Sequence, residues 1–367
     1  MTYIWQNEDW PHFFFDKARV ESAYNRYMYQ KGIADGAFAM LSERARQMMI
    51  AESLSTETVS SSAIEGVDLQ YDSVYSSIIR QLDVEMAFKA KYDRNAESVS
   101  KLIMDANRNH SPLTLERLFD WHRLLFDGVA KGFAPKHIGA FRSGPVYVVH
   151  NTHRDTEIIY EGIPADRIEK GTEALLAYIN SDQEPNLIIK SALASFWFVS
   201  IHPFDDGNGR ISRAIADYIL SIESGTGFRP YSVSGTIIKD RKPYYDSLQI
   251  SQKSSSLDIT PWITWYIDAV CTSLAEAVEQ CHKKLKVSSI MSSLDPNKYN
   301  SRQLFMLYRL ADGSFYGKLT AEKWMKMTKC QSATATRDLS SLVENGLLVR
   351  LGDGGKGTHY ILNPNLQ

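Results

Sequence analysis

The sequence predicts a mainly α-helical protein with little β-structure. Residues 187–201 are apolar on nearly every side of a helix, which is typical of a helix at the centre of a bundle. Beyond residue 209, apolar side chains recur at helical spacing, at Ile211, Ala214, Ile215, Tyr218 and Ile219. Short β-prone segments occur at residues 146–149 and near the C-terminus. We therefore expect a helical bundle with small β-hairpins.

The composition is that of an ordinary soluble chain, long enough for two or three domains. The chain has 367 residues, of which 44% are hydrophobic and 23% charged. No uncharged apolar run reaches the roughly eighteen residues of a membrane span, and residues 1–10 lack a signal-peptide pattern. Three cysteines without metal-site spacing argue against a disulfide framework. We expect a cytoplasmic protein with no membrane partner.

Three segments are expected along the chain. Residues 1–111 are predicted to be mostly helical, although Gly32 and Gly36 are candidate interruptions. Residues 112–287 form the predicted core, in which Thr114 caps a helix near its start and a long helix begins around Thr260 and ends it. Serine, aspartate, proline and asparagine mark a linker that opens the third segment, residues 288–367. That segment is predicted to contain three helices and then a hairpin.

Residues 201–213 carry more chemistry than a structural loop needs. Their sequence is Ile-His-Pro-Phe-Asp-Asp-Gly-Asn-Gly-Arg-Ile-Ser-Arg. Gly207 and Gly209 flank Asn208, so the backbone can turn tightly and aim N–H groups at one point, where a helix begins and phosphate is favoured. Arg210 and Arg213 share one helical face and offer planar guanidinium groups to phosphate oxygens. The run therefore predicts a polyphosphate site.

Two further side chains extend this site. Asp206 offers a hard oxygen ligand, and Mg²⁺ commonly binds through one or two carboxylates plus substrate phosphates. His202 titrates near neutral pH and can take a proton from an attacking hydroxyl. The run contains neither a Walker A loop nor the Gly-x-Gly-x-x-Gly of dinucleotide folds. A different kind of phosphate site is needed.

These residues resemble the signature of the Fic (filamentation induced by cAMP) family, His-Pro-Phe-x-Asp/Glu-Gly-Asn-Gly-Arg-x-x-Arg, at every defined position. The resemblance implies a helical fold and transfer of AMP from ATP to a Ser, Thr or Tyr hydroxyl of a target protein, with Mg²⁺ as the metal. It implies a role for each site residue: His202 as general base, Asp206 as metal ligand, Asn208 and Gly209 on the α-phosphate, Arg210 and Arg213 on the outer phosphates.

An upstream segment, residues 61–66, acquires meaning beside this signature. Alone, Ser-Ser-Ala-Ile-Glu-Gly is typical of a helix end closed by glycine. It also resembles the Ser/Thr-x-x-x-Glu-Gly/Asn motif of the family's inhibitory helix. The resemblance implies that Glu65 contacts Arg213 and obstructs the γ-phosphate, since a carboxylate can occupy the guanidinium that a phosphate would use.

Residues 139–142 resemble the family's Gly-x-Phe/Trp-Arg segment, which leads into a two-stranded flap. The resemblance assigns target docking by strand addition to Val146, Tyr147 and Val148. Tyr244 and Tyr245 match a family position near the nucleotide base, with core packing as an equal alternative. His122 lies on the apolar side of its predicted helix, so we expect a hydrogen-bonded core histidine.

The C-terminal segment looks like a winged helix, and residues 330–339 are similar to recognition helices of regulators. That helix carries Arg337 against Asp338 and Glu344, so protein contact or homodimerisation is slightly favoured over nucleic-acid binding. Two alternatives to AMP transfer stay open. One is hydrolysis of AMP from a modified protein, with Glu65 orienting water; the other is a DNA-binding regulator that senses a nucleotide.

Overall fold

The computed structural model describes residues 2–84, 90–151, 156–223, 229–311, 315, 318–352 and 357–366. The chain divides into two compact units, one made of Met1–Gly36 with Ser42–Ala277 and the other of Ala37–Leu41 with Val278–Gln367. The expected start of the third segment, residue 288, lies ten residues beyond this division. Both positions fall within one long helix, α11 (Thr260–Ser293).

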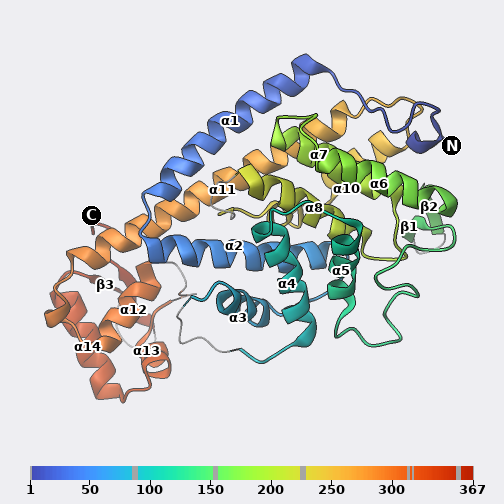
Figure 1. Ribbon diagram of the computed structural model, residues 1–367. Helices are drawn as coiled ribbons and strands as arrows, with labels where there is room; N and C mark the ends of the chain where they lie inside the picture. The colour runs from blue at the N-terminus through green and yellow to red at the C-terminus, as the bar shows by residue number, and fades with distance from the viewer. Residues whose placement is uncertain are drawn as a thin grey trace. The chain divides into compact units, whose positions relative to one another are not determined.

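The prediction of a mainly α-helical fold is confirmed (Figure 1). In the described residues, the strands form two antiparallel hairpins, β1 with β2 and β3 with β4. The first unit contains the following helices besides most of α11: α1 (Lys17–Ala39) up to Gly36, α2 (Glu43–Ile64), α3 (Tyr71–Gln81), α4 (Arg94–Arg108), α5 (Leu115–Phe126), α6 (Ile168–Ile179), α7 (Leu187–Ile201), α8 (Asn208–Glu223), α9 (Val233–Ile237) and α10 (Lys242–Gln252). Its strands are β1 (Tyr147–Asn151) and β2 (Thr156–Glu161).

Local sequence explains several helix ends. Thr114 caps α5 by accepting a hydrogen bond from the Arg117 N–H, as predicted. Asp93 and Ser42 cap α4 and α2 in the same way. Helix α1 continues through Gly32 without the predicted interruption, because an isolated glycine costs a helix only about 1 kcal/mol.

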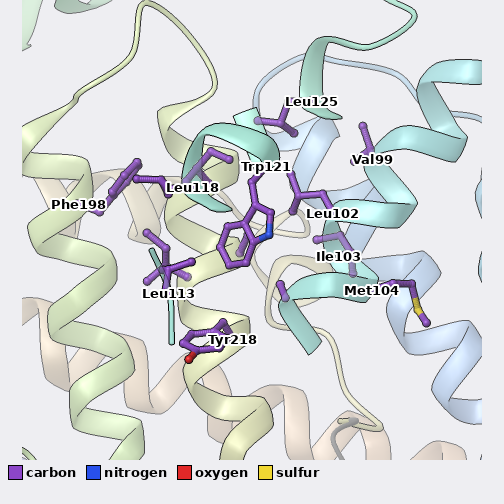
Figure 2. Close-up of a cluster of buried hydrophobic side chains, with 14 of the residues drawn as sticks. Val99, Leu102, Ile103, Met104, Leu113, Leu118, Trp121, Leu125, Phe198 and Tyr218 are labelled. Carbon is purple, nitrogen blue, oxygen red and sulfur yellow. The ribbon is translucent and has the colours of Figure 1, made fainter. Parts of the chain in front are cut away.

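The core of the first unit surrounds α7, which is buried along almost its whole length and packs against α6 and α8. Trp121 of α5 lies at the centre of the cluster in Figure 2, between side chains of α4, α7 and α8. Its indole N–H donates to Asp105 Oδ2 at 2.7 Å, which satisfies the polar group that burial would otherwise leave unpaired. Removing so large a buried side chain typically costs about 3 to 5 kcal/mol. This core gives α7 and α8 a rigid setting, and the signature loop joins those two helices.

The second unit contains α12 (Ser301–Ala311), α13 (Ala321–Thr328), α14 (Ser332–Glu344), β3 (Leu348–Leu351) and β4 (His359–Leu362). Three helices followed by a hairpin is the predicted order, while the assignment as a winged helix stays a prediction. Its separate core includes Trp324, Leu339 and Leu342. Among the described residues of the whole chain, no helix is both long and apolar enough to cross a bilayer.

Candidate active site

The signature loop begins where α7 ends. His202 follows Ile201 in the left-handed conformation, with φ 53° and ψ 60°, and its N–H donates to the Phe198 carbonyl at 3.0 Å. Residues other than glycine adopt this conformation infrequently and often at functional sites. The turn ends α7 and directs the loop toward the start of α8.

A buried arginine that carried no assigned role holds this turn in place. Arg142 donates from Nε to the His202 carbonyl at 2.7 Å, and from its two terminal nitrogens to the carbonyls of Gly144 and Ile163, each at 2.5 Å. Its main-chain N–H donates to the Pro203 carbonyl at 3.0 Å. Arg142 therefore ties the loop to the segments on both sides of the β1–β2 hairpin.

The His202 ring is positioned as a neutral base. Its Nδ1 lies 3.1 Å from the Val199 carbonyl oxygen, which can only accept, so Nδ1 carries the proton and Nε2 keeps its lone pair. Burial lowers the pKa of His202 to about 4, and the positive charge of Arg142 acts in the same direction. At neutral pH the ring is therefore unprotonated and able to accept a proton at Nε2.

A second histidine, His122, contacts the backbone of the signature loop. His122 is fully buried, and its Nδ1 accepts from the Gly139 N–H at 2.9 Å, so its Nε2–H donates to the Asp206 carbonyl at 3.1 Å. Its ring stacks on Phe204 with the centroids 4.0 Å apart. The prediction of a hydrogen-bonded core histidine is confirmed.

The two neighbouring aspartates have different surroundings. Asp205 Oδ2 accepts from the N–H and from Nδ1 of His137, at 3.0 and 2.8 Å. Asp206 has a side chain that is 57% exposed, with Oδ1 on the Gly207 N–H and Oδ2 3.6 Å from Arg210 Nη2. In the described part of the chain, no cluster of three or more His, Cys, Asp or Glu side chains has the arrangement of a metal site. Asp206 is thus the accessible carboxylate of the loop, suited to Mg²⁺ only together with substrate phosphates.

The predicted anion nest lies at the start of α8. Gly207 has a φ of +84° and Asn208 is the first residue of the helix, whose first amides have no partner within the helix. The Asn208 side chain does not face this nest: its Nδ2 donates to the Phe204 carbonyl at 2.8 Å and its Oδ1 accepts from the Phe204 N–H at 3.0 Å. Asn208 therefore closes the loop with its side chain and offers an anion only its main-chain N–H.

The two arginines of the signature are both buried but have different partners. Arg213 donates from Nε to Ser61 Oγ at 2.9 Å, from Nη2 to the Ser61 carbonyl at 2.7 Å, and from Nη1 to Glu65 Oε1 at 2.9 Å. Arg210 stacks over the Phe126 ring, and its Nε has no hydrogen-bond partner. Burial lowers the pKa of Arg210. Arg210 is a desolvated cation whose ion pair with the exposed Asp206 is long, at 3.6 Å, which is a favourable setting for a phosphate.

Glu65 directly follows α2 and lies next to the anion nest at the start of α8. A methyl group at Gly209 would lie 2.0 Å from Glu65 Oε1, so the carboxylate lies against the first turn of α8. Gly66 follows with a φ of +76°, the conformation in which glycine commonly closes a helix. The carboxylate thus occupies space over the nest as well as Arg213.

The face of α2 that carries Glu65 has two other anchors. Glu57 is buried and accepts from the Ser234 N–H at 3.0 Å and from Ser232 Oγ at 2.7 Å, at the start of α9. Glu57, Ser61 and Glu65 are spaced at four-residue intervals and therefore share one face of the helix. Glu57 carried no assigned role in the sequence, because nothing local distinguishes it from a surface glutamate.

The two predicted nucleotide tyrosines contact the same region. Tyr244 is buried, with its hydroxyl 3.4 Å from Arg213 Nη1. Tyr245 is exposed on one side, and its hydroxyl donates to the Ile64 carbonyl at 3.2 Å, as does Arg241 Nη1 at the same distance. Arg241 was not predicted, because nothing in the local sequence distinguishes it from the neighbouring exposed Lys239 and Lys242.

The predicted flap lies close to His202. In the β1–β2 hairpin Tyr147 pairs with Glu161 and Val148 with Tyr160, and Val146 precedes β1, its carbonyl accepting from the Gly162 N–H at 3.1 Å. A methyl group at Gly162 would lie 2.9 Å from His202 Cβ, so the end of the hairpin at Gly162 adjoins the signature loop. The outer edge of β1 has no neighbouring strand in the described residues. Docking of a target on Val146, Tyr147 and Val148 stays a prediction.

Known proteins resemble this chain in sequence and in fold. Residues 112–220 match the Fic/DOC family, and residues 3–84 match a domain of unknown function, DUF4172. Protein adenylyltransferase fic-1 of Caenorhabditis elegans is 23% identical over 161 residues, which are 43% of this chain and 27% of that protein. Protein adenylyltransferase Fic of Culex quinquefasciatus is 29% identical over 165 residues, 44% of this chain and 28% of its own. The chain thus spans less than a third of the length of these two relatives.

Solved structures resemble the chain at the level of fold. A Fic family protein from Desulfovibrio desulfuricans G20 has a TM-score of 0.56 at 20% identity, covering 96% of this chain and 98% of its own. Fic-1 of Caenorhabditis elegans, residues 134–508, has a TM-score of 0.51 at 18% identity, covering 73% of this chain and 74% of its own.

Proposed function

Residues 112–220 of this chain are a Fic/DOC-family domain, and from that premise we propose that the chain transfers AMP from ATP to a Ser, Thr or Tyr hydroxyl of a target protein. The observation that carries the proposal is the neutral His202 ring with a free Nε2, fixed one loop away from a helix N-terminus that two buried arginines flank. This combination provides a base beside an anion site.

ATP would bind along the start of α8. The main-chain amides of Asn208 and Gly209 hold the α-phosphate, and Gly207 allows the turn that exposes them. Arg210 and, once released, Arg213 hold the outer phosphates. Mg²⁺ would bind Asp206 and the phosphates and would neutralise part of their negative charge. Tyr244 and Tyr245 border this site and are candidates for contact with the nucleoside.

The reaction requires one proton transfer and one displacement. The flap holds an extended segment of the target beside β1, which brings its hydroxyl near His202. His202 Nε2 takes the hydroxyl proton while the oxygen attacks the α-phosphorus. The bond from that phosphorus to the bridging oxygen breaks, and pyrophosphate leaves. Arg142 keeps His202 in its left-handed turn through this step.

Glu65 makes the resting protein inactive in this proposal. Its carboxylate lies on Arg213 and against Gly209, the two places that the polyphosphate needs. Binding of ATP in a reactive position therefore requires α2 or the Glu65 side chain to move. The same geometry favours one alternative, since a carboxylate above the nest can also orient a water molecule toward the α-phosphate of a modified protein.

The test compares ATP labelled at its α-phosphate with ATP labelled at its γ-phosphate. The Glu65→Gly variant, incubated with each and with a whole lysate, should incorporate the α-label into protein and not the γ-label, and Glu65→Gly combined with His202→Ala should incorporate neither. Mass spectrometry then identifies the modified hydroxyl. Incorporation of the γ-label would overturn the proposal. If wild type releases AMP from a modified protein and Glu65→Gly does not, the hydrolytic alternative replaces it.

A further inference from the structure

The two units of the chain have opposite net charge. The whole chain has 41 Lys and Arg against 43 Asp and Glu, but residues 278–367 have 13 against 7. Residues 37–41 contain no charged side chain, so the second unit is clearly basic and the first is acidic. Although the whole chain is close to neutral, its second unit is therefore positively charged, and positive charge attracts polyanions such as nucleic acids.

Four of these thirteen basic side chains, Lys323, Lys326, Lys329 and Arg337, lie on α13, α14 and the connection between them. Helices α13 and α14 pack against each other through Trp324, Ala335 and Leu339 and are joined by three residues (Figure 1). Lys329, the first residue of the connection, is left-handed with a φ of 52°, which turns the chain sharply between the helices. Lys326 and Lys329 are exposed at the end of α13 next to this turn.

The outer face of α14 is suited to close approach. Ala333, Thr336, Arg337, Ser340 and Glu344 are exposed and recur at helical spacing. The first four are small, hydroxylic or basic. Glu344 is the last residue of the helix, about 16 Å from Ala333 at 1.5 Å per residue.

Asp338 does not weaken this face, although its charge counted against nucleic acid in the sequence. It is buried and accepts from Arg302 Nε at 2.8 Å and from Asn300 Nδ2 at 2.8 Å. The hydrogen bonds from these groups lower the pKa of Asp338 and keep it ionised inside the unit. Between Ala333 and Ser340, the outward side of α14 therefore carries Arg337 as its one charged side chain.

We propose that this surface, composed of Lys326, Lys329 and the outer face of α14 from Ala333 to Ser340, binds double-stranded DNA, with α14 in the major groove. A single helix fits that groove, where hydroxyl and guanidinium groups meet base edges, while the lysines at the adjoining turn contact phosphates. A protein partner fits less well, because the face lacks the large aromatic and aliphatic anchors of protein interfaces. Duplex RNA fits less well, because its major groove is too deep and narrow for a helix.

The test measures fluorescence anisotropy of a labelled DNA duplex of about 20 base pairs with the full chain, at several KCl concentrations from about 50 to about 200 mM. Two phosphate contacts, from Lys326 and Lys329, predict a slope of about −1.8 in log affinity against log salt, so affinity should fall about 12-fold over this range. Arg337→Ala should weaken binding with little change in slope, because its guanidinium group meets base edges, whereas Lys326→Ala should reduce the slope by about 0.9. Lys329→Asn should do the same, because asparagine tolerates the left-handed conformation.

The matched control is Lys170→Ala, an exposed lysine of α6 in the first unit, which should leave slope and affinity unchanged. Circular dichroism establishes that each variant is folded. The proposal is overturned if the wild-type chain does not bind at the lowest salt, if Lys170→Ala weakens binding as much as Lys326→Ala, or if a duplex RNA of the same sequence binds equally well. It is also overturned if the α13 and α14 substitutions change the mass of the free protein in light scattering but not its DNA binding, since the surface would then serve self-association.

Discussion

Replacing Glu65 should activate the protein. In Glu65→Gly the carboxylate that lies 2.9 Å from Arg213 Nη1 and against Gly209 is gone, while both arginines remain for phosphate. The outer phosphates of ATP can then occupy Arg213, which aligns the α-phosphate for attack. We expect incorporation of labelled AMP into protein, including the protein itself, to rise.

The size of the increase follows from the surroundings of this ion pair. Two unit charges about 4 Å apart attract by about 4 kcal/mol at an effective dielectric constant of 20, before the cost of removing them from water. Arg213 is almost wholly buried while the Glu65 side chain is 30% exposed, so desolvation cancels much of that attraction. A hydrogen bond to a charged group leaves a net of about 1.5 to 3 kcal/mol. At about 1.4 kcal/mol per tenfold change, release should raise the rate about 10- to 100-fold.

The assay uses wild type, Glu65→Gly and Glu65→Gln at equal folded concentration, with initial rates of AMP incorporation. Glu65→Gln keeps the size and an acceptor oxygen but loses the charge, so its rate should lie between the other two. Glu43→Gln, at the opposite end of α2, is the matched control and should behave as wild type. Equal rates for wild type and Glu65→Gly would refute the inhibitory role, and a glutamine variant as active as the glycine variant would show that charge alone matters.

Three further predictions concern other side chains of the site. His202→Ala should lower AMP incorporation about 10²- to 10⁴-fold without unfolding the protein. In an active protein that keeps His202, kcat/KM should fall only as pH drops through about 4, since burial lowers the pKa of His202 to about that value. A midpoint near pH 6.5 would contradict this. Burial also lowers the pKa of His122 to about 4, so as pH falls the unfolded chain takes up this proton before the folded protein does. The free energy of unfolding should therefore decline by about 1.4 kcal/mol per pH unit between about pH 6.5 and about pH 4. Urea unfolding of wild type and His122→Gln should show different dependences on pH, and parallel dependences would disprove the prediction. Arg241→Ala and Tyr245→Phe each remove a hydrogen-bond donor to the Ile64 carbonyl at the end of α2. Because this end of α2 holds Glu65, each variant should raise AMP incorporation about 2- to 10-fold and speed amide hydrogen exchange at residues 61–66. Unchanged exchange would count against a role of these two side chains in holding α2.

Local sequence patterns predicted the helices and the chemistry of the signature well. The apolar run of α7, the Thr114 cap and the glycines beside Asn208 depend on neighbours within a few positions, which a sequence displays directly. The signature run likewise lists its chemistry in order. These features needed no knowledge of the fold.

The remaining parts of the site depend on contacts between distant segments. Arg142 supports His202 across 60 residues, and Arg241 reaches Ile64 across 177. The prediction that Asn208 contacts the α-phosphate did not say with which group; its side-chain amide bonds to the Phe204 backbone, which leaves the main-chain N–H for an anion. Likewise, burial decided that Asp338 is an internal charge and not a surface one. Sequence spacing gives the identity of such groups but not which of their possible partners they meet.

The even spacing of the anchors on α2 makes the control of the site depend on the number of residues between Glu57 and Glu65 as well as on their identity. An α-helix turns by about 100° per residue, so one inserted residue between Glu57 and Glu65 would rotate the glutamate away from Arg213 while Glu57 stayed on α9. Substitutions at the two half-buried intervening positions, Val59 and Ala63, would leave that alignment intact. Helix α2 therefore fixes the rotation of Glu65 relative to Glu57, and an insertion or deletion between them would break that relation.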